Sequence, residues 1–208
     1  MPTVVIDHPL AAHRLAALRD EATGAAAFRR ALHELGVFLV YEATRSLGQS
    51  EVTVQTPLAA AKATVLADVP VLVPVLRAGL GLLDAALILL PDADVGMVGL
   101  QRDEQTLLPS SYLAKLPASL AGRGALVLDP MLATGGSLLH ALTVLRGAGC
   151  TALSVCCVLA APEGLAHVAA NGFGDVTVYT AAIDDRLDER GFIVPGLGDA
   201  GDRQFGTL

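Results

Sequence analysis

A loop of small and polar residues carries the clearest chemistry in this sequence: Asp129-Pro130-Met131-Leu132-Ala133-Thr134-Gly135-Gly136-Ser137. The apolar run Ala125 to Leu128 before the loop predicts a strand, and the apolar-periodic run Leu138 to Leu145 after it predicts a helix. Backbone N–H groups at the start of a helix can bind an anion, and glycine lets the backbone approach that anion closely. The hydroxyl groups of Thr134 and Ser137 and the carboxylate of Asp129 add polar contacts. The loop therefore predicts a site for a phosphate and a sugar.

Arginines follow other predicted strands. Arg77 comes directly after the apolar run Val71 to Leu76 and is followed by Gly79 and Gly81. Arg102 comes just after the run Val95 to Leu100 and begins the polar segment 101–116, which we expect to be irregular. A guanidinium group is always charged and can contact two phosphate oxygens at once, which suits a pyrophosphate. We interpret Arg77 as a pyrophosphate contact and Arg102 as a mobile arginine that closes over a leaving group.

The tight turn at Arg77 also predicts unusual backbone geometry. Between Leu76 and Ala78 we expect a strained peptide bond, such as a cis non-proline bond, which costs about 3 kcal/mol.

The positions of the apolar runs indicate an α/β fold. Predicted strands cover Val71 to Val75, Val95 to Leu100, Ala125 to Leu128, Leu153 to Leu159 and Val176 to Thr180. Predicted helices cover Pro9 to Arg19, Ala25 to Leu47, Leu80 to Leu90, Ser137 to Ala148 and Glu163 to Ala170. Strands that are apolar throughout are typical of an open, mostly parallel sheet flanked by helices, in which ligands bind at the carboxyl ends of the strands.

We expect a single domain over 1–208, made of three parts. A helical N-terminal arm (1–68) precedes the sheet core (69–182), and a C-terminal tail (183–208) follows it. The tail is rich in Gly, Asp and Arg, and we expect it to form no core.

Composition excludes several classes of protein. Of the 208 residues, 53% are hydrophobic and 17% charged, which argues against disorder. The net charge of −7 and the lack of a basic run argue against nucleic-acid or anionic-membrane binding. Charged residues and prolines interrupt the most apolar region well short of the roughly 18 apolar residues of a membrane span. With no recognisable secretion signal, we expect a cytoplasmic protein.

The tail contains a glycine pattern that needs a separate interpretation. Its letters fit G-x-G-x-x-G from Gly196 to Gly201, but no clear strand precedes it and only seven residues follow. We therefore do not interpret it as a dinucleotide-binding fingerprint. Its glycines instead allow the backbone to wrap a small planar ligand, and main-chain groups at Ile193 and from Gly198 to Ala200 could match a pyrimidine edge.

These segments together resemble the uracil phosphoribosyltransferase family, a branch of the type I phosphoribosyltransferases. The matching stretches are LRAGLG from Leu76, QRDEQTLLP from Gln101, VLDPMLATGGS from Val127, AAPEG from Ala160, PGLGDAGDRQFGT from Pro195, VIDHPLAAHRLAALRD from Val5 and YEATR from Tyr41. They cover essentially the whole chain in order, and PGLGDAGD is the most specific. The resemblance implies the type I phosphoribosyltransferase fold, with a uracil-binding hood over 183–208.

The resemblance also implies an activity and its residues. The ribose 5-phosphate group of phosphoribosyl pyrophosphate (PRPP) would pass to uracil, giving UMP and pyrophosphate in pyrimidine salvage. The implied PRPP contacts are Arg77, Arg102, residues 129–137 and Asp199, and the implied uracil contacts are Ile193, Gly198, Asp199 and Ala200. The catalytic residues among these would be Arg77, Arg102, Asp129 and Asp199.

Further properties follow from the resemblance alone. Mg²⁺ would be held mainly through PRPP, and no protein ligand of the metal is assigned. The protein would be a homodimer or homotetramer, and GTP acts as an effector in some relatives. The sequence departs from related phosphoribosyltransferases at Asp129-Pro130, where many carry two acidic residues, and at Gln101, where an aromatic residue is common.

Two other functions are open at this point. A non-catalytic PRPP-sensing regulator would keep the ligand loop and control RNA or another protein, although the lack of a basic patch counts against RNA. A phosphoribosyltransferase for another base would share the PRPP site and differ in the tail.

Overall fold

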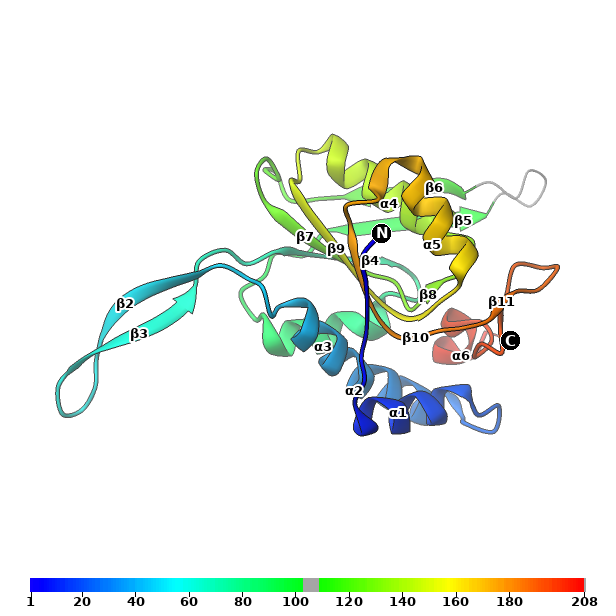
Figure 1. Cartoon of the computed structure of the whole chain (residues 1–208), viewed down its shortest axis with the longest axis horizontal. Helices are drawn as coiled ribbons and strands as arrows, with labels where there is room; N and C mark the ends of the chain where they lie inside the picture. The colour runs from blue at the N-terminus through cyan, green and yellow to red at the C-terminus, as the bar shows by residue number, and fades with distance from the viewer. Residues whose placement is uncertain (103–108, 208) are drawn as a thin grey trace.

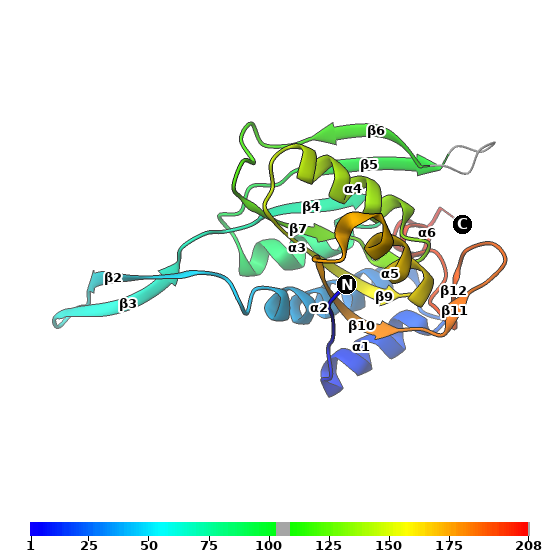
Figure 2. The same cartoon turned by 45° about the horizontal axis from the view of Figure 1, so that its top comes forward.

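The computed structural model describes residues 1–102 and 109–207, with the backbone alone for 100–102 and 109–111. Within this part of the chain, an 8-stranded sheet has the order β1-β10-β9-β7-β4-β5-β6, with β8 beside β9 (Figures 1 and 2). Its strands are β1 (Thr3–Val5), β4 (Val71–Leu76), β5 (Met97–Arg102), β6 (Pro109–Lys115), β7 (Gly124–Leu128), β8 (Met131–Leu132), β9 (Ala152–Ala160) and β10 (Thr177–Ile183). All pairs are parallel except β5 with β6, which confirms the predicted open, mostly parallel sheet.

Helices cover both faces of this sheet (Figure 2). One face carries α1 (Pro9–Arg19), α2 (Ala25–Ala43) and α3 (Leu80–Leu89), and the other carries α4 (Gly136–Gly147), α5 (Pro162–Val168) and a wide turn, η1 (Ala169–Phe173). Phe28, Leu32, Leu35 and Leu39 of α2 are all buried, as their spacing predicts for one face of a helix. The central strands β4 and β7 are buried on both sides, which explains their uniformly apolar sequence.

The N-terminal region contains more strand than its sequence indicates. Helix α2 ends at Ala43, before the expected Leu47, and β1 pairs with β10 at the edge of the main sheet. Beyond α2, a hairpin of β2 (Gln49–Gln55) and β3 (Ala60–Leu66) projects from the body at the end opposite the C-terminus (Figure 1). The hairpin was missed because it has no buried face from which a period of two could be recognised.

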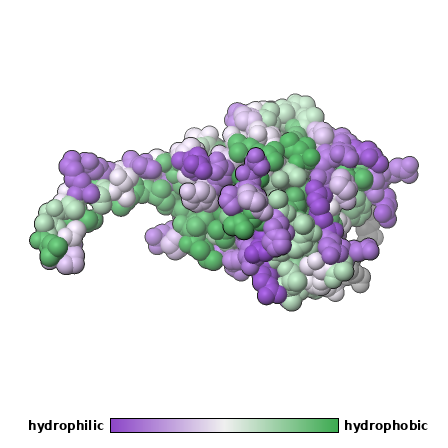
Figure 3. Space-filling view, turned by 60° about the horizontal axis from the view of Figure 1, so that its bottom comes forward, coloured by the Kyte–Doolittle hydropathy of each residue, from purple (hydrophilic) through white to green (hydrophobic). Residues whose placement is uncertain are grey.

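The hairpin exposes apolar side chains to an unusual degree. Leu58 near its tip is 96% exposed, and Val54, Val65 and Leu66 are also exposed. Figure 3 shows hydrophobic surface at the tip, well away from the body of the protein. Because an isolated two-stranded hairpin is marginally stable in water, this element would gain stability from a partner surface.

The polar segment after β5 is partly regular. It was expected to be irregular over 101–116, but residues 109–115 form β6, which pairs antiparallel with β5. An edge strand has one neighbour and is partly open to water, so its side chains need not follow a clear apolar pattern. Residues 103–108 lie outside the described residues.

The C-terminal tail is packed into the protein. It forms β11 (Arg186–Leu187), β12 (Ile193–Val194) and a short helix, α6 (Ala200–Phe205). Ile193, Leu197 and Ala200 are at most 5% exposed and join the hydrophobic cluster of α1 and α2. The expectation that the tail forms no core is therefore wrong, because single apolar residues between glycines can fill a surface that other elements supply.

A partly buried ion pair fastens the tail to α1. The Arg19 guanidinium donates through Nη1 to Asp184 Oδ2 at 2.8 Å and to the Gly196 carbonyl at 2.9 Å. Asp184 is only 6% exposed, and it also accepts a hydrogen bond from the Gly196 N–H at 2.8 Å. Burial raises the pKa of Asp184, but its hydrogen bonds from Arg19 and Gly196 outweigh burial, so the net pKa is lowered.

Removing the cation should destabilise the protein because it leaves the Asp184 carboxylate buried without its partner. For Arg19→Met we expect a loss of about 2–3 kcal/mol in the free energy of unfolding, measured by urea titration. Arg14 lies on the same helix and pairs with Glu34 in a more exposed position, with side chains 35% and 38% exposed. Arg14→Met should therefore cost less than about 1 kcal/mol. Equal losses in the two variants would contradict a special role for Arg19.

Candidate active site

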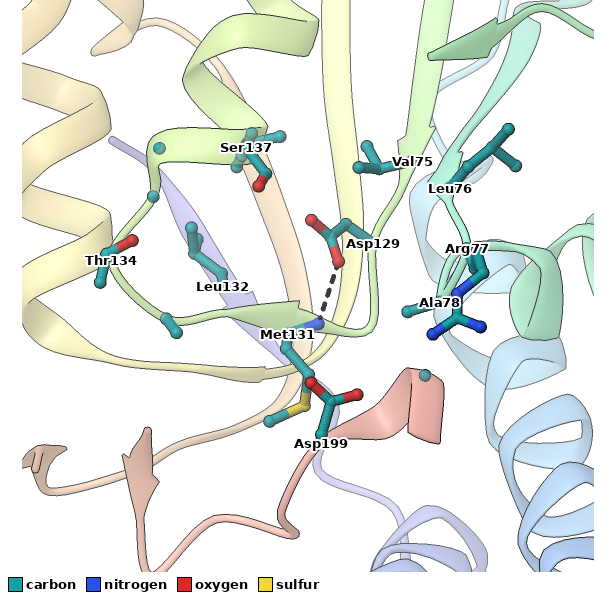
Figure 4. Close-up of a pocket in the computed structure, with 15 residues that line it drawn as sticks. Val75, Leu76, Arg77, Ala78, Asp129, Met131, Leu132, Thr134, Ser137 and Asp199 are labelled. Atoms are coloured by element: carbon teal, nitrogen blue, oxygen red, sulfur yellow. Dashed lines mark hydrogen bonds between the residues drawn. The ribbon is translucent and has the colours of Figure 1, made fainter. Parts of the chain in front are cut away.

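A pocket lies at the carboxyl ends of β4 and β7, where a parallel sheet is expected to bind ligands. Three separate segments meet there: the loop after β4, the loop between β7 and α4, and the start of α6 (Figure 4). The lining residues are Val75, Leu76, Arg77, Ala78, Asp129, Met131, Leu132, Ala133, Thr134, Gly135, Gly136, Ser137, Leu138, Asp199 and Gly201.

The loop before α4 has the geometry of an anion site. Gly135 precedes the helix with φ of 81°, a left-handed conformation that favours glycine, and α4 begins at the next residue. This turn directs the first N–H groups of a 12-residue helix toward the pocket that Thr134 and Ser137 also line. The arrangement can hold a phosphate through backbone donors, hydroxyl groups and the helix dipole.

Asp129 occupies the centre of the pocket, between Arg77 and Ser137 (Figure 4). Its carboxylate accepts a hydrogen bond from the Met131 N–H at 3.3 Å, and the residue is only 9% exposed. The pKa of Asp129 is raised to about 7, mainly by burial and to a smaller extent by the charge of Asp199, while the hydrogen bond from Met131 lowers it. The ligand-free site therefore holds a carboxyl group that can exchange a proton near neutral pH.

The Arg77 loop contains the predicted unusual backbone. The peptide bond between Leu76 and Arg77 is cis, which confirms the expectation of a cis non-proline bond. Gly79 allows the loop to pack against β7, because a Cβ atom there would lie 2.3 Å from the Leu128 carbonyl oxygen. The Arg77 side chain is 55% exposed, and its Nη2 lies 3.4 Å from Asp202 Oδ1. The guanidinium is thus accessible to an anionic ligand.

The start of α6 closes one edge of the pocket. Asp199 caps this helix by accepting a hydrogen bond from the Asp202 N–H at 2.9 Å, and its side chain also lines the pocket. Figure 4 shows Asp199 reaching the site from the tail, opposite Ser137. The tail is therefore part of the same site as the loop before α4.

The structure brings together most of the residues that the sequence analysis selected. Arg77, Asp129, residues 131–137 and Asp199 line one pocket. Pro130 does not line it, and its carbonyl instead accepts hydrogen bonds from Val158 and Leu159. Ile193, Gly198 and Ala200 also lie outside the lining, on the tail before and after Asp199. Arg102 ends β5, but its side chain lies outside the described residues.

A few lining residues were not selected from the sequence. They are Val75, Leu76, Ala78, Leu138 and Gly201. All of them lie within or next to the sequence stretches that carry the family resemblance. Their position beside a selected residue is therefore the signal that could have identified them.

The site can be tested for its fit to a divalent cation. Among the described residues, no group of three or more His, Cys, Asp or Glu side chains is arranged to hold a metal. Two carboxylates, Asp129 and Asp199, face the pocket. Mg²⁺ is commonly held by one or two carboxylates together with substrate phosphates, so these residues fit a Mg²⁺ ion that arrives with a phosphorylated ligand.

Comparison with solved structures identifies the class of the fold. The structure of a protein from Aquifex aeolicus superposes with a TM-score of 0.91 at 40% identity, over 98% of this chain and 97% of that one. Adenine phosphoribosyltransferase from Trypanosoma brucei superposes with a TM-score of 0.61 at 12% identity, over 95% and 86% of the two chains, which bears on the fold alone. The fold is that of a type I phosphoribosyltransferase.

Sequence comparison is more specific. The family model for uracil phosphoribosyltransferase matches residues 5–207. Curated uracil phosphoribosyltransferases are 49% identical in Clostridium beijerinckii and 52% identical in Kineococcus radiotolerans, each over 98% of both chains. A third, from Corynebacterium diphtheriae, is 50% identical over 97% of this chain and 95% of its own. The chain belongs to the uracil phosphoribosyltransferase family, whose members are pentosyltransferases.

The described helices also bear on membrane insertion. None of those within 1–102 and 109–207 combines the length and the apolar character needed to cross a bilayer.

The raised pKa of Asp129 predicts how stability depends on pH. The unfolded chain ionises this group near 3.8, whereas the folded protein keeps its proton up to about 7. The folded state therefore binds the extra proton between these values, and its stability falls as the pH rises from about 4 to about 7. A shift of this size corresponds to at most about 4 kcal/mol.

We therefore expect Asp129→Asn to stabilise the ligand-free protein more at pH 8 than at pH 5, by about 2–3 kcal/mol in urea unfolding. Ser137→Ala changes a residue of the same pocket that does not titrate, and its effect should be equal at the two pH values. If the two variants show the same pH dependence, Asp129 is not the group responsible.

Proposed function

We propose that this protein transfers the ribose 5-phosphate group from PRPP to a ring nitrogen of uracil, giving UMP and pyrophosphate in pyrimidine salvage. The proposal rests on the composition of the pocket, in a chain that belongs to the uracil phosphoribosyltransferase family. The pocket joins the phosphate-type loop before α4, the Arg77 loop and Asp199 of the tail. A site of this kind offers separate positions for a sugar phosphate, a pyrophosphate and a base.

In this proposal each segment contacts one part of the substrates. The N–H groups at the start of α4, with Thr134 and Ser137, hold the 5-phosphate. The carboxylate of Asp129 orients the ribose hydroxyl groups, and Arg77 and Arg102 neutralise the pyrophosphate. The remaining loop residues, from Pro130 to Ala133, contribute backbone and shape.

Uracil recognition belongs to the tail. The main-chain groups of Ile193, Gly198, Asp199 and Ala200 match the alternating donors and acceptors of the pyrimidine edge. The packing of Ile193 and Ala200 into the core supports this assignment, because it holds the tail next to the pocket. We expect a bound base to lie between these groups and the ribose.

The reaction is a displacement at the anomeric carbon of PRPP. Positive charge develops on the ribose as the bond to pyrophosphate breaks. A ring nitrogen of uracil adds from the opposite face, which inverts that carbon, and gives up its proton to solvent or to the departing pyrophosphate. Mg²⁺ bound to PRPP, with Asp129 and Asp199 nearby, would neutralise the negative charge of the departing pyrophosphate. The protein residues contribute position and fixed charge, and no covalent enzyme intermediate is needed.

A self-associated protein, a homodimer or homotetramer, is part of the same proposal. The exposed apolar residues of the β2–β3 hairpin support it, because a second copy would remove them from water. Regulation by GTP and a cytoplasmic location stay predictions, the first from the family resemblance and the second from the sequence.

A direct assay tests the activity. The purified protein is mixed with PRPP, Mg²⁺ and uracil, and UMP is measured by chromatography. Adenine, guanine and cytosine replace uracil in parallel reactions. UMP formation with uracil alone supports the proposal. Product from another base would favour a different phosphoribosyltransferase, and PRPP binding without product would favour a PRPP-sensing regulator.

Arg102 gives a sharper test of the mechanism. Arg102→Ala should lower turnover at saturating substrates by on the order of 100-fold, because it removes a positioned charge from the leaving pyrophosphate. Arg45 provides the control, because its side chain is 64% exposed and pairs with Glu42 of α2. Arg45→Ala should keep normal turnover. Unchanged turnover in Arg102→Ala would remove this residue from the mechanism.

A further inference from the structure

The helix α6 carries a buried polar side chain to which neither the sequence analysis nor the proposed mechanism gives a role. Gln204 is only 1% exposed, although the neighbouring Phe205 is exposed. Its Nε2 donates to the carbonyl of Ala200 at 2.9 Å and to the carbonyl of Ala78 at 3.0 Å. The first bond stays within α6, whereas the second crosses to the loop after β4.

The partner of the second bond is placed where it can affect a ligand. Ala78 directly follows Arg77, and both residues line the pocket. The side-chain amide of Gln204 also packs against the next turn of that segment, since a Cβ atom on Gly81 would lie 2.2 Å from its Oε1. Gln204 thus contacts the Arg77 loop without lining the pocket itself.

The other end of α6 belongs to the base-recognition segment. Asp199 caps the helix and lines the pocket, and Ala200 is buried at its first position. Arg203 holds the helix on α1 by donating to the carbonyls of Leu18, Leu197 and Asp20. In addition, Arg29 of α2 donates to the Gln204 carbonyl at 2.6 Å. The helix is therefore held from several sides, and Gln204 connects it to the Arg77 loop.

We propose that Gln204 is a positioning residue, which holds the Arg77 loop in the shape that receives the pyrophosphate of PRPP and ties that loop to the tail that recognises the base. The inference rests on the proposed function for its consequence in binding, but its structural part can be measured without any substrate. Arg77 contacts the ligand in this scheme, and Gln204 acts through Arg77.

The test uses variants that keep the volume of the side chain. Gln204→Met fills the same space but donates no hydrogen bond to Ala78. Gln204→Glu places a carboxyl group there, which donates to a carbonyl only when it is protonated. Gln55 on the exposed hairpin provides the matched control, because its Nε2 donates only to the neighbouring Thr56 carbonyl among the bonds described.

The first measurement is hydrogen exchange on the ligand-free protein. Amides from Ala78 to Gly81 should exchange at least fivefold faster in Gln204→Met than in the unmodified protein, while Gln55→Met leaves them unchanged. Unchanged exchange in Gln204→Met would overturn the inference whatever the enzyme does.

The second measurement is PRPP affinity with Mg²⁺, by calorimetry. We expect the dissociation constant to rise about tenfold in Gln204→Met and in Gln204→Glu at pH 8. Lowering the pH toward 5.5 should bring Gln204→Glu back to within about threefold of the unmodified protein at the same pH, and should not rescue Gln204→Met. Charged side chains of the segments around this position are Arg29 on α2, Arg77 in the loop, Asp199 at the cap of α6, and Asp202 and Arg203 on α6.

The outcomes separate the two proposals. Gln204→Met could bind PRPP more weakly while the PRPP affinity of Gln204→Glu does not recover at low pH. This result would attribute the loss of affinity to side-chain packing and not to the hydrogen bond to Ala78, and it would overturn the positioning role. If the unmodified protein forms no UMP, the proposed function fails. Faster loop exchange in Gln204→Met would then still show that Gln204 holds the loop.

Discussion

Direct contact between backbone segments at the carboxyl ends of β4 and β7 is the constraint on which the site depends. Gly79 comes so close to the Leu128 carbonyl that any side chain there would collide with it. This contact brings the loop of Arg77 next to the strand end that carries Asp129. Because one loop carries a cation and the other carries a carboxylate and the anion-binding turn, their proximity creates a site for a ligand with both phosphates and hydroxyl groups.

The charges of the pocket fit the proposed ligand, PRPP together with Mg²⁺. Asp129 is buried, and this burial raises its pKa to about 7, so that it can keep a proton near neutral pH. Arg77 lies at the rim of the pocket in contact with Asp202, largely open to water. A magnesium–phosphate ligand would change both environments at once, by favouring the ionised carboxylate and by giving the arginine a stronger partner. In the proposed mechanism, the fixed charges of the site therefore reach their catalytic arrangement only when the ligand is bound.

The tail shows how a glycine-rich segment can be held in one conformation. It has few apolar residues, so polar side chains do much of the fastening by donating to main-chain carbonyls. Arg19 reaches Gly196, Arg203 reaches α1 and the chain after it, and Gln204 reaches Ala78. Each of these bonds joins residues that are far apart in the sequence. The segment to which we assign base recognition is thus held in place by side chains from other parts of the protein.

The sequence by itself determined the parallel sheet, the helix α4 with its ligand loop, and the family. Uniform apolar runs and the order Asp, Thr, Gly, Gly, Ser are local signals that depend on neighbouring residues alone. It also indicated the cis bond before Arg77, because a turn that tight leaves the backbone few options.

Only the tertiary structure decided how the tail packs, where the β2–β3 hairpin lies and what Gln204 contacts. A buried glutamine and an exposed hairpin have no pattern within a short stretch of sequence. The glutamine contacts Ala78, which lies more than one hundred residues away in the sequence. The hairpin projects from the body of the protein, so no other described element of the fold buries its side chains in a pattern that could mark it.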